Sequence, residues 1–179
     1  MSKFHASPKE WIKVVVVVKG ECIKPEFFDV INYAICQAAN EYLHGKVIDF
    51  FRRVGEYHLD EALRRGLLKI DKEDKPLDVL IKIAKYLESV GYMKKIVIQK
   101  LGEDEAFVEM YGVSVTKSSA NIIREGKQPS HFMTNVMIAA LKRYGIEAKL
   151  EDVKFDENER HFKEHWKILR ASGDCEEEV

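Results

Sequence analysis

The feature that most constrains the fold is a pair of alternating apolar segments joined by a short polar turn. Residues 94–101 (KKIVIQKL) and 106–112 (AFVEMYG) flank the turn GEDE at 102–105. Period-two alternation on both sides of a four-residue turn is typical of a β-hairpin. Because strands joined in this way pair antiparallel, this part of the chain predicts an antiparallel sheet.

A second strand-forming region follows the most apolar helix of the chain. Residues 131–144 carry large apolar side chains at helical spacing, and Gly145 is placed to end that helix. Ile146 to Phe155 alternates as a strand, with a shift of the inward set that predicts a bulge near Glu151. Residues 160–169 fit either a strand (Phe162, Trp166 and Ile168 on one face) or a helix (Phe162, Trp166 and Leu169 on one face).

The rest of the chain is mostly helical. Helices are expected from Pro25 to about Tyr42, over a second apolar face from Val47, from Pro76 through Val90, and over 116–125, with breaks at Gly45, Gly55 and Gly66. The β-branched run in residues 11–19 (WIKVVVVVK) predicts an additional N-terminal strand. Blocks of helices alternating with hairpins give an α+β fold, in which an antiparallel sheet of two hairpins packs against a block of helices.

Size and composition predict a single domain over residues 1–179, with 171–179 as a frayed tail. The net charge is −1, which gives no sign of a nucleic-acid partner. The longest apolar run is too short to span a membrane, so we expect a cytoplasmic protein. Three cysteines without CxxC spacing argue against a disulfide framework, and abundant Lys and Glu favour a thermophilic, for example archaeal, source.

Several segments together are similar to a known family. These are FFRRVGEYHLDEALRRG, a helix ending LESVGY, the hairpin, then GKQPSHF, an apolar helix and AKLEDVKF. In this order they resemble the 4-vinyl-reductase-type (hydrocarbon-binding) domain, which belongs to a wider group with the TRAPP vesicle-tethering subunits and haem–nitric-oxide-binding domains. The resemblance covers about 26–169. It implies a closed α+β fold around a pocket for a small hydrophobic or aromatic ligand, used as a sensory module.

The resemblance also implies positions for a zinc site. The family's first cysteine falls at His131, its glutamate at Glu151, its next cysteine at Lys154 and its last near His161. Imidazole is a good zinc ligand, but the ammonium group of Lys154 has no free lone pair and repels a cation. Zinc is therefore considered as a cofactor with His131, Glu151 and His161 as its ligands, and loss of the site is the alternative.

Another possible metal motif lies near the C-terminus. His161, Glu164 and His165 match the string H-x-x-E-H, in which two histidines of one helical face hold zinc. On a strand the two histidines would lie about 13 Å apart and could not share one ion. The resemblance favours the strand, and the simpler interpretation of this segment is a charged, solvated face.

The main functional hypothesis is a non-enzymatic module that senses or carries a small hydrophobic ligand, and that forms a homodimer through its long N-terminal helices. The expected pocket residues are Met110, Phe132, Met133 and Met137, which fall on the hairpin and the apolar helix; ordinary core packing is the alternative role for them. Two other functions stay open: a metal-dependent enzyme with a His/Glu site, and a TRAPP-like assembly subunit without a ligand.

Overall fold

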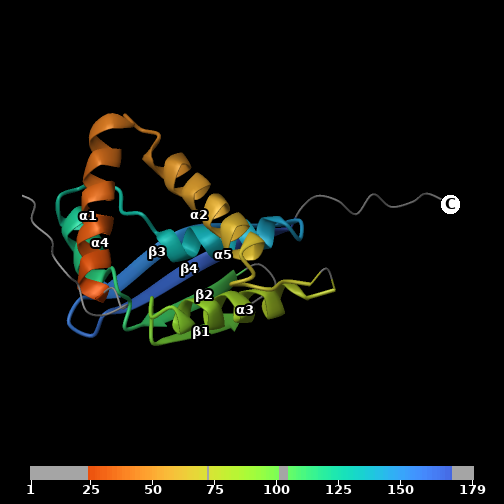
Figure 1. Ribbon diagram of the computed structural model, residues 1–179. Coiled ribbons are helices and arrows are strands. Elements are labelled where there is room, and N and C mark those ends of the chain that lie inside the picture. The colour runs from red at the N-terminus through yellow and green to blue at the C-terminus, as the bar shows by residue number, and fades with distance from the viewer. Residues whose placement is uncertain (1–23, 72, 101–104, 171–179) are drawn as a thin grey trace, which may run out of the picture.

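The structure is a computed structural model that describes residues 24–71, 73–100 and 105–170. Its elements follow the order of the chain in Figure 1. Helices α1, α2 and α3 precede the first hairpin, α4 and α5 separate the two hairpins, and the second hairpin ends the described part. The bounds are α1 Pro25–Tyr42, α2 Val47–Arg64, α3 Pro76–Ser89, β1 Lys95–Lys100, β2 Glu105–Tyr111, α4 Thr116–Arg124, α5 Phe132–Lys142, β3 Ile146–Asp156 and β4 His161–Arg170.

The strands form one antiparallel sheet in the order β1-β2-β4-β3. The predicted α+β architecture with two hairpins is confirmed. Residues 161–170 form a strand, which settles the ambiguity between strand and helix. The register of β3 against β4 shifts between Leu150 and Asp152, so the bulge expected near Glu151 is present. The predicted strand at 11–19 lies outside the described residues.

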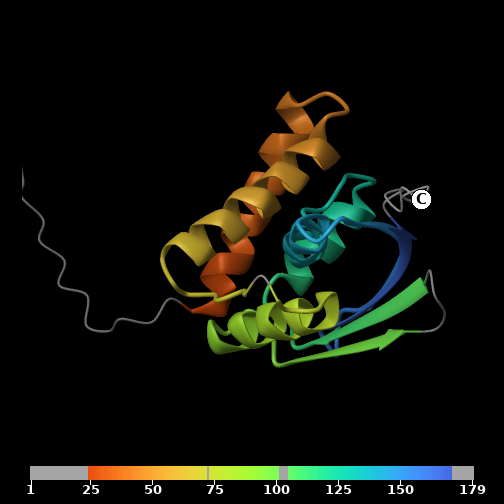
Figure 2. The same ribbon diagram turned by 90° about the vertical axis from the view of Figure 1, so that its right-hand side faces the viewer.

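Helix α5 occupies the centre of the molecule, in the concavity of the curved sheet (Figure 2). Helix α2 crosses α5 closely at Gly55, where an added Cβ would lie 2.7 Å from the carbonyl carbon of Asn135. The sequence predicted a helix break at Gly55, and this prediction is wrong because α2 continues through it to Arg64. The absence of a side chain at Gly55 allows α2 to pack closely against α5, and it does not end the helix. Gly66, with a φ of +69°, does follow the end of α2.

The main core lies between α3, α5 and the sheet. The apolar face predicted for residues 131–144 lies in this core, where Met133, Val136, Met137, Ala140 and Leu141 are buried. In α3 the apolar periodicity places Leu80, Ile83, Ala84 and Leu87 in the core, whereas the side chain of Ile81 is exposed. Fully or almost fully buried members of the core include Val79, Ile83, Leu87, Val108, Met110, Met133, Val136, Met137, Ala140, Leu141, Phe162 and Trp166.

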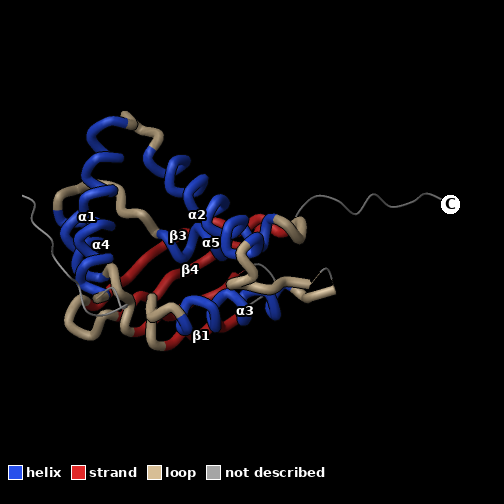
Figure 3. Tube along the Cα trace, viewed as in Figure 1, coloured by secondary structure: helices blue, strands red, loops and turns tan. Residues whose placement is uncertain are grey.

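Helix α1 stands at the side of the molecule and packs against α4 (Figures 1 and 3). Its buried residues are Asn32, Cys36 and Ala39. The large apolar residues that recur along α1 in the sequence point outward instead: Phe27 is 57% exposed, Ile35 45% and Tyr42 71%. Among the described residues, no helix is both long and apolar enough to cross a membrane.

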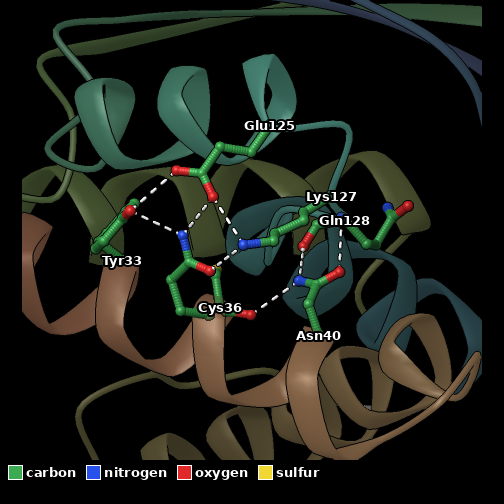
Figure 4. A network of polar contacts seen from close by, with 7 residues as sticks. Tyr33, Cys36, Asn40, Glu125, Lys127 and Gln128 are labelled. Carbon is green, nitrogen blue, oxygen red and sulfur yellow. Dashed lines mark hydrogen bonds and ion pairs between the residues drawn. The ribbon is translucent and has the colours of Figure 1, made fainter.

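The inner face of α1 makes both polar and apolar contacts (Figure 4). Asn40 donates from its amide to the carbonyl oxygen of Gln128 and accepts from the Gln128 backbone N–H, at 2.8 and 2.9 Å. Tyr33 and Gln37 both donate to the carboxylate of Glu125, at the C-terminal end of α4. These hydrogen bonds add to a small apolar cluster in which α1 packs against α2 and α4.

Candidate functional site

The inner face of β4 carries a carboxyl group among apolar side chains. Residues at alternate positions of a strand share a face, so Glu164 lies between Phe162 and Trp166 on the side that faces the core. Its cross-strand partners are Val108 on β2 and Val153 on β3. Glu164 is 2% exposed, which is rare for glutamate unless the group is paired or has a function.

Glu164 accepts two hydrogen bonds from neutral donors. The hydroxyl of Thr134 on α5 lies 2.5 Å from Oε1, and the indole Nε1–H of Trp166 lies 2.8 Å from Oε2. Burial outweighs these two bonds and raises the pKa of Glu164 to about 7. In the described part of the chain no lysine, arginine or histidine makes an ion pair with this carboxyl group. It is a buried acid without a counter-charge.

Beside Glu164 lies a small cavity of about 30 Å³. It is bordered by α4, the loop before α5, the first turn of α5, strands β2 and β4, and the segments that follow α3 and β2. Most of its wall is apolar and aromatic, with hydroxyl groups and one imidazole. The lining residues include Tyr92, Met110, Val113, Val115, Ser119, Ser130, His131, Phe132, Met133, Thr134, Phe162 and Glu164. This is room for about one water molecule.

Residues of the loop between α4 and α5 line both this cavity and a larger outer cleft. Pro129, Ser130, His131 and Thr134 line both spaces. The outer cleft, of about 200 Å³, lies against α2 and β3, where its other walls include Phe51. These four shared residues place the buried carboxyl group close to a space several times larger.

His131 holds the position immediately before α5. Its backbone is in the left-handed region, with a φ of 42°, a conformation that residues other than glycine adopt uncommonly. Burial lowers the pKa of its imidazole to about 4, so the ring is neutral at physiological pH. The Ser130 hydroxyl does not cap α5, because it donates to Asn32 Oδ1 at 2.8 Å. Ser130 thereby joins the wall of the cavity to α1.

The residues expected to form the pocket lie near this cavity. Met110, Phe132 and Met133 line it, whereas Met137 is buried one turn further along α5 and does not. Glu164 and Thr134 were missed by the sequence analysis, which treated the segment HFKEH as a solvated face. The signal was present, because Phe162 and Trp166 had been placed on one face of a strand, and Glu164 falls between them at period two.

The residues expected to bind zinc are not brought together. His131 lies in the cavity wall, whereas Glu151 is exposed at the bulge of β3. His161 pairs with Asp156, five residues from Glu151 along β3, roughly 16 Å at about 3.3 Å per residue. Over residues 24–71, 73–100 and 105–170, no group of three or more His, Cys, Asp or Glu side chains could hold a metal ion.

The histidines of the H-x-x-E-H string point away from Glu164. His161 stacks on Tyr111 with ring centroids 4.3 Å apart, and His165 lies 4.9 Å from the ring of Phe107. Their odd-numbered positions place them on the outer face of β4, as alternation along a strand requires. The helical geometry that this metal motif needs is therefore absent from residues 161–165.

Comparisons with known proteins bear on the fold. No protein-family model matches the sequence, and a comparison with curated proteins finds no match. Among solved structures, the chain is similar to a trafficking protein particle complex subunit 3 from Naegleria fowleri (12% identity, 82% of this chain and 96% of that chain, TM-score 0.56). It is also similar to a Cs H-NOX mutant containing 4-cyano-L-phenylalanine (12% identity, 91% and 83% covered, TM-score 0.50).

A third structure, an H-NOX mutant of T. tengcongensis, matches at 12% identity over 91% of this chain and 84% of that chain, with a TM-score of 0.50. At such identities the likeness is one of fold. The chain has the fold shared by the trafficking subunit and the H-NOX domains, as the wider group named above implies.

Proposed function

We propose that this protein is a small-molecule-binding domain, a sensor or carrier of the 4-vinyl-reductase (hydrocarbon-binding) type, whose ligand occupies the space beside Glu164. The observation that carries this proposal is a cavity lined by Met110, Phe132 and Met133 that also contains a buried acid. Ligand sites are mostly apolar and hold a few placed polar groups. Pure core packing gives no reason to bury a carboxyl group that has no counter-charge.

A ligand larger than water requires the cavity to open. The segment from Pro129 to His131 separates the cavity of about 30 Å³ from the cleft of about 200 Å³. The left-handed backbone of His131 marks a strained point in this segment. We propose that a ligand joins the two spaces by displacing this segment and the side chain of Phe132, while the sheet stays in place.

The similar structures agree with a ligand-binding role. The trafficking subunit from Naegleria fowleri is described as covalently bound to palmitic acid, so this fold can hold an apolar molecule. Another H-NOX structure, with a TM-score of 0.50, is described in terms of haem distortion. These are properties of those proteins; they support the idea that the space around α5 can be adapted to different ligands.

Native mass spectrometry tests the proposal. Protein purified without added ligand is expected to carry a mass excess that disappears on denaturation. Ser119→Leu fills the cavity without removing a side-chain hydrogen bond assigned to Ser119, and it should abolish the excess. Ser89→Leu makes the same chemical change at an exposed position of α3 and should leave it intact. The proposal would be rejected if protein from several expression conditions carried no ligand and bound no added apolar compound.

We also propose that the outer face of α1 mediates assembly with a second copy of the chain. Phe27, Ile35 and Tyr42 are strongly exposed along one helix, and exposed apolar patches of this kind mark interaction sites. Light scattering after size exclusion should give a dimer mass. Ile35→Asp should give a monomer, and the same charge introduced by Asn121→Asp on α4 should not. A monomeric wild-type protein at high concentration would refute this part.

A further inference from the structure

We propose that the ligand of this cavity carries a protonated amine, which binds the carboxylate of Glu164 while the apolar part of the ligand contacts the aromatic wall. This inference rests on the proposed function and specifies its ligand class. It is carried by three features of the cavity: a buried acid held by neutral donors, an aromatic lining, and a wall that contains no lysine or arginine.

The hydrogen bonds of Glu164 prepare it to accept a further donor. Thr134 and Trp166 each occupy one lone-pair direction of the carboxylate and orient it, but neither brings a positive charge. A carboxylate offers about four acceptor directions, so two stay open. An ammonium group placed there would form a charge-assisted hydrogen bond and neutralise a charge that is otherwise costly to bury.

The aromatic lining suits the same ligand. Tyr92, Phe132 and Phe162 line the cavity, and the ring centroids of Tyr92 and Phe132 are 5.8 Å apart. Aromatic faces attract cations and also accept apolar groups. The sulfur of Met110 adds a polarisable contact. A compact amine with an alkyl or aryl body matches this combination of surfaces better than a uniformly apolar ligand does.

The charges around the cavity discriminate against anions. Among the described residues that line it there is no lysine or arginine. The titratable side chains that line it with Glu164 are Tyr92, a buried phenol whose pKa is raised, and His131, which is neutral. The strand partners Val108 and Val153 and the helix residue Thr134 carry no charge. A carboxylate or phosphate ligand would meet a buried acid with nothing to compensate it.

Three ligands of matched shape test the inference: benzylamine, benzyl alcohol and benzoate, measured by isothermal titration calorimetry at pH 8. The amine is expected to bind at least tenfold more tightly than the alcohol, and benzoate should not bind. Glu164→Gln should weaken amine binding at least tenfold and change alcohol binding less than twofold. Between pH 6 and pH 8 amine affinity should rise severalfold in the wild type, as Glu164 ionises, and stay flat in the variant.

The indole N–H resonance of Trp166 gives a second readout, because this group donates to Glu164. The chain has two tryptophans, so Trp11→Phe assigns the signal. Benzylamine should shift the Trp166 signal. The same spectrum also shows whether the Glu164→Gln variant keeps the fold of the wild type. Equal affinity for amine and alcohol, or amine binding insensitive to Glu164→Gln, overturns the amine inference while the binding function stands. If benzylamine does not bind, the inference fails whatever mass spectrometry shows.

Discussion

Helix α5 buries its large apolar side chains, whereas helix α1 leaves its large apolar side chains exposed. Helix α5 turns its apolar face, including Val136, Met137 and Ala140, into the main core. Helix α1 turns Asn32 inward and leaves Phe27 and Ile35 in solvent. The difference shows that α1 keeps small and polar residues inward, and that its large apolar side chains lie on the outer face. In the α5 region the acidic residue Glu164 is buried, with Thr134 of α5 as a hydrogen-bond partner.

The largest effect is expected where α5 meets α2. Gly55→Ala places a Cβ 2.7 Å from the backbone of Asn135, so the two helices must separate. We expect a loss of about 3 kcal/mol or more in the free energy of unfolding, measured by urea denaturation. Gly45→Ala is the control: it has a φ of +86° and open space around it, so it should cost only about 1 kcal/mol of backbone strain. Equal losses would contradict a close α2–α5 contact.

The shifted pKa values of Glu164 and His131 predict opposite changes of folding stability with pH. The raised pKa of Glu164 means that the folded state holds a proton that the unfolded chain loses between about pH 4.5 and 7, so stability falls across that window. The lowered pKa of His131 has the opposite sign, and stability rises between about pH 4 and 6.5. In the wild type the two contributions largely cancel.

Single variants should separate these contributions. Glu164→Gln removes the Glu164 contribution, so its stability should rise relative to that of the wild type by roughly 3 kcal/mol from pH 4.5 to 7, since one pKa unit corresponds to about 1.4 kcal/mol. His131→Asn tolerates the left-handed backbone and removes the His131 contribution, so its stability should fall relative to that of the wild type by a similar amount from pH 4 to 6.5. Urea denaturation at several pH values measures both. Parallel pH profiles in the wild type and both variants would show that neither group is titrating while buried.

A smaller loss of folding stability is expected from a substitution in α1. Asn32 donates to the hydroxyl of Ser118 and accepts from the hydroxyl of Ser130, both at 2.8 Å. Asn32→Ala removes both bonds and leaves the buried Ser130 hydroxyl without this acceptor, while the Ser118 hydroxyl still donates to the carbonyl oxygen of Val115. The loss should cost about 2 kcal/mol in unfolding free energy. Asn121→Ala removes only an exposed contact to Arg124 and should cost less than about 0.5 kcal/mol. A neutral Asn32→Ala would mean that apolar packing, not polar pairing, holds α1.

Periodicity was enough to predict the first hairpin, the helices, the strand β3 and its bulge, because each depends on local alternation and turn chemistry. For residues 160–169 it fitted a strand and a helix equally. It was misleading for α1, where the apolar stripe was visible but the side facing the body of the protein was decided by Asn32 and Asn40, whose partners lie far away in sequence. The predicted helix break at Gly55 was wrong for the same reason, because the role of Gly55 depends on its contact with Asn135, which is distant in sequence. Glu164 could have been found by extending the alternation of β4, but its burial depends on α5 covering that face.

A high-resolution crystal structure of the purified protein tests the central claim most directly. The account predicts electron density larger than a water molecule beside Glu164, with a donor atom about 3 Å from its carboxylate and the segment Pro129–His131 displaced toward the outer cleft. A closed cavity containing a single water, unchanged after soaking with benzylamine, would contradict the account and leave the carboxyl group as a purely structural feature of the core.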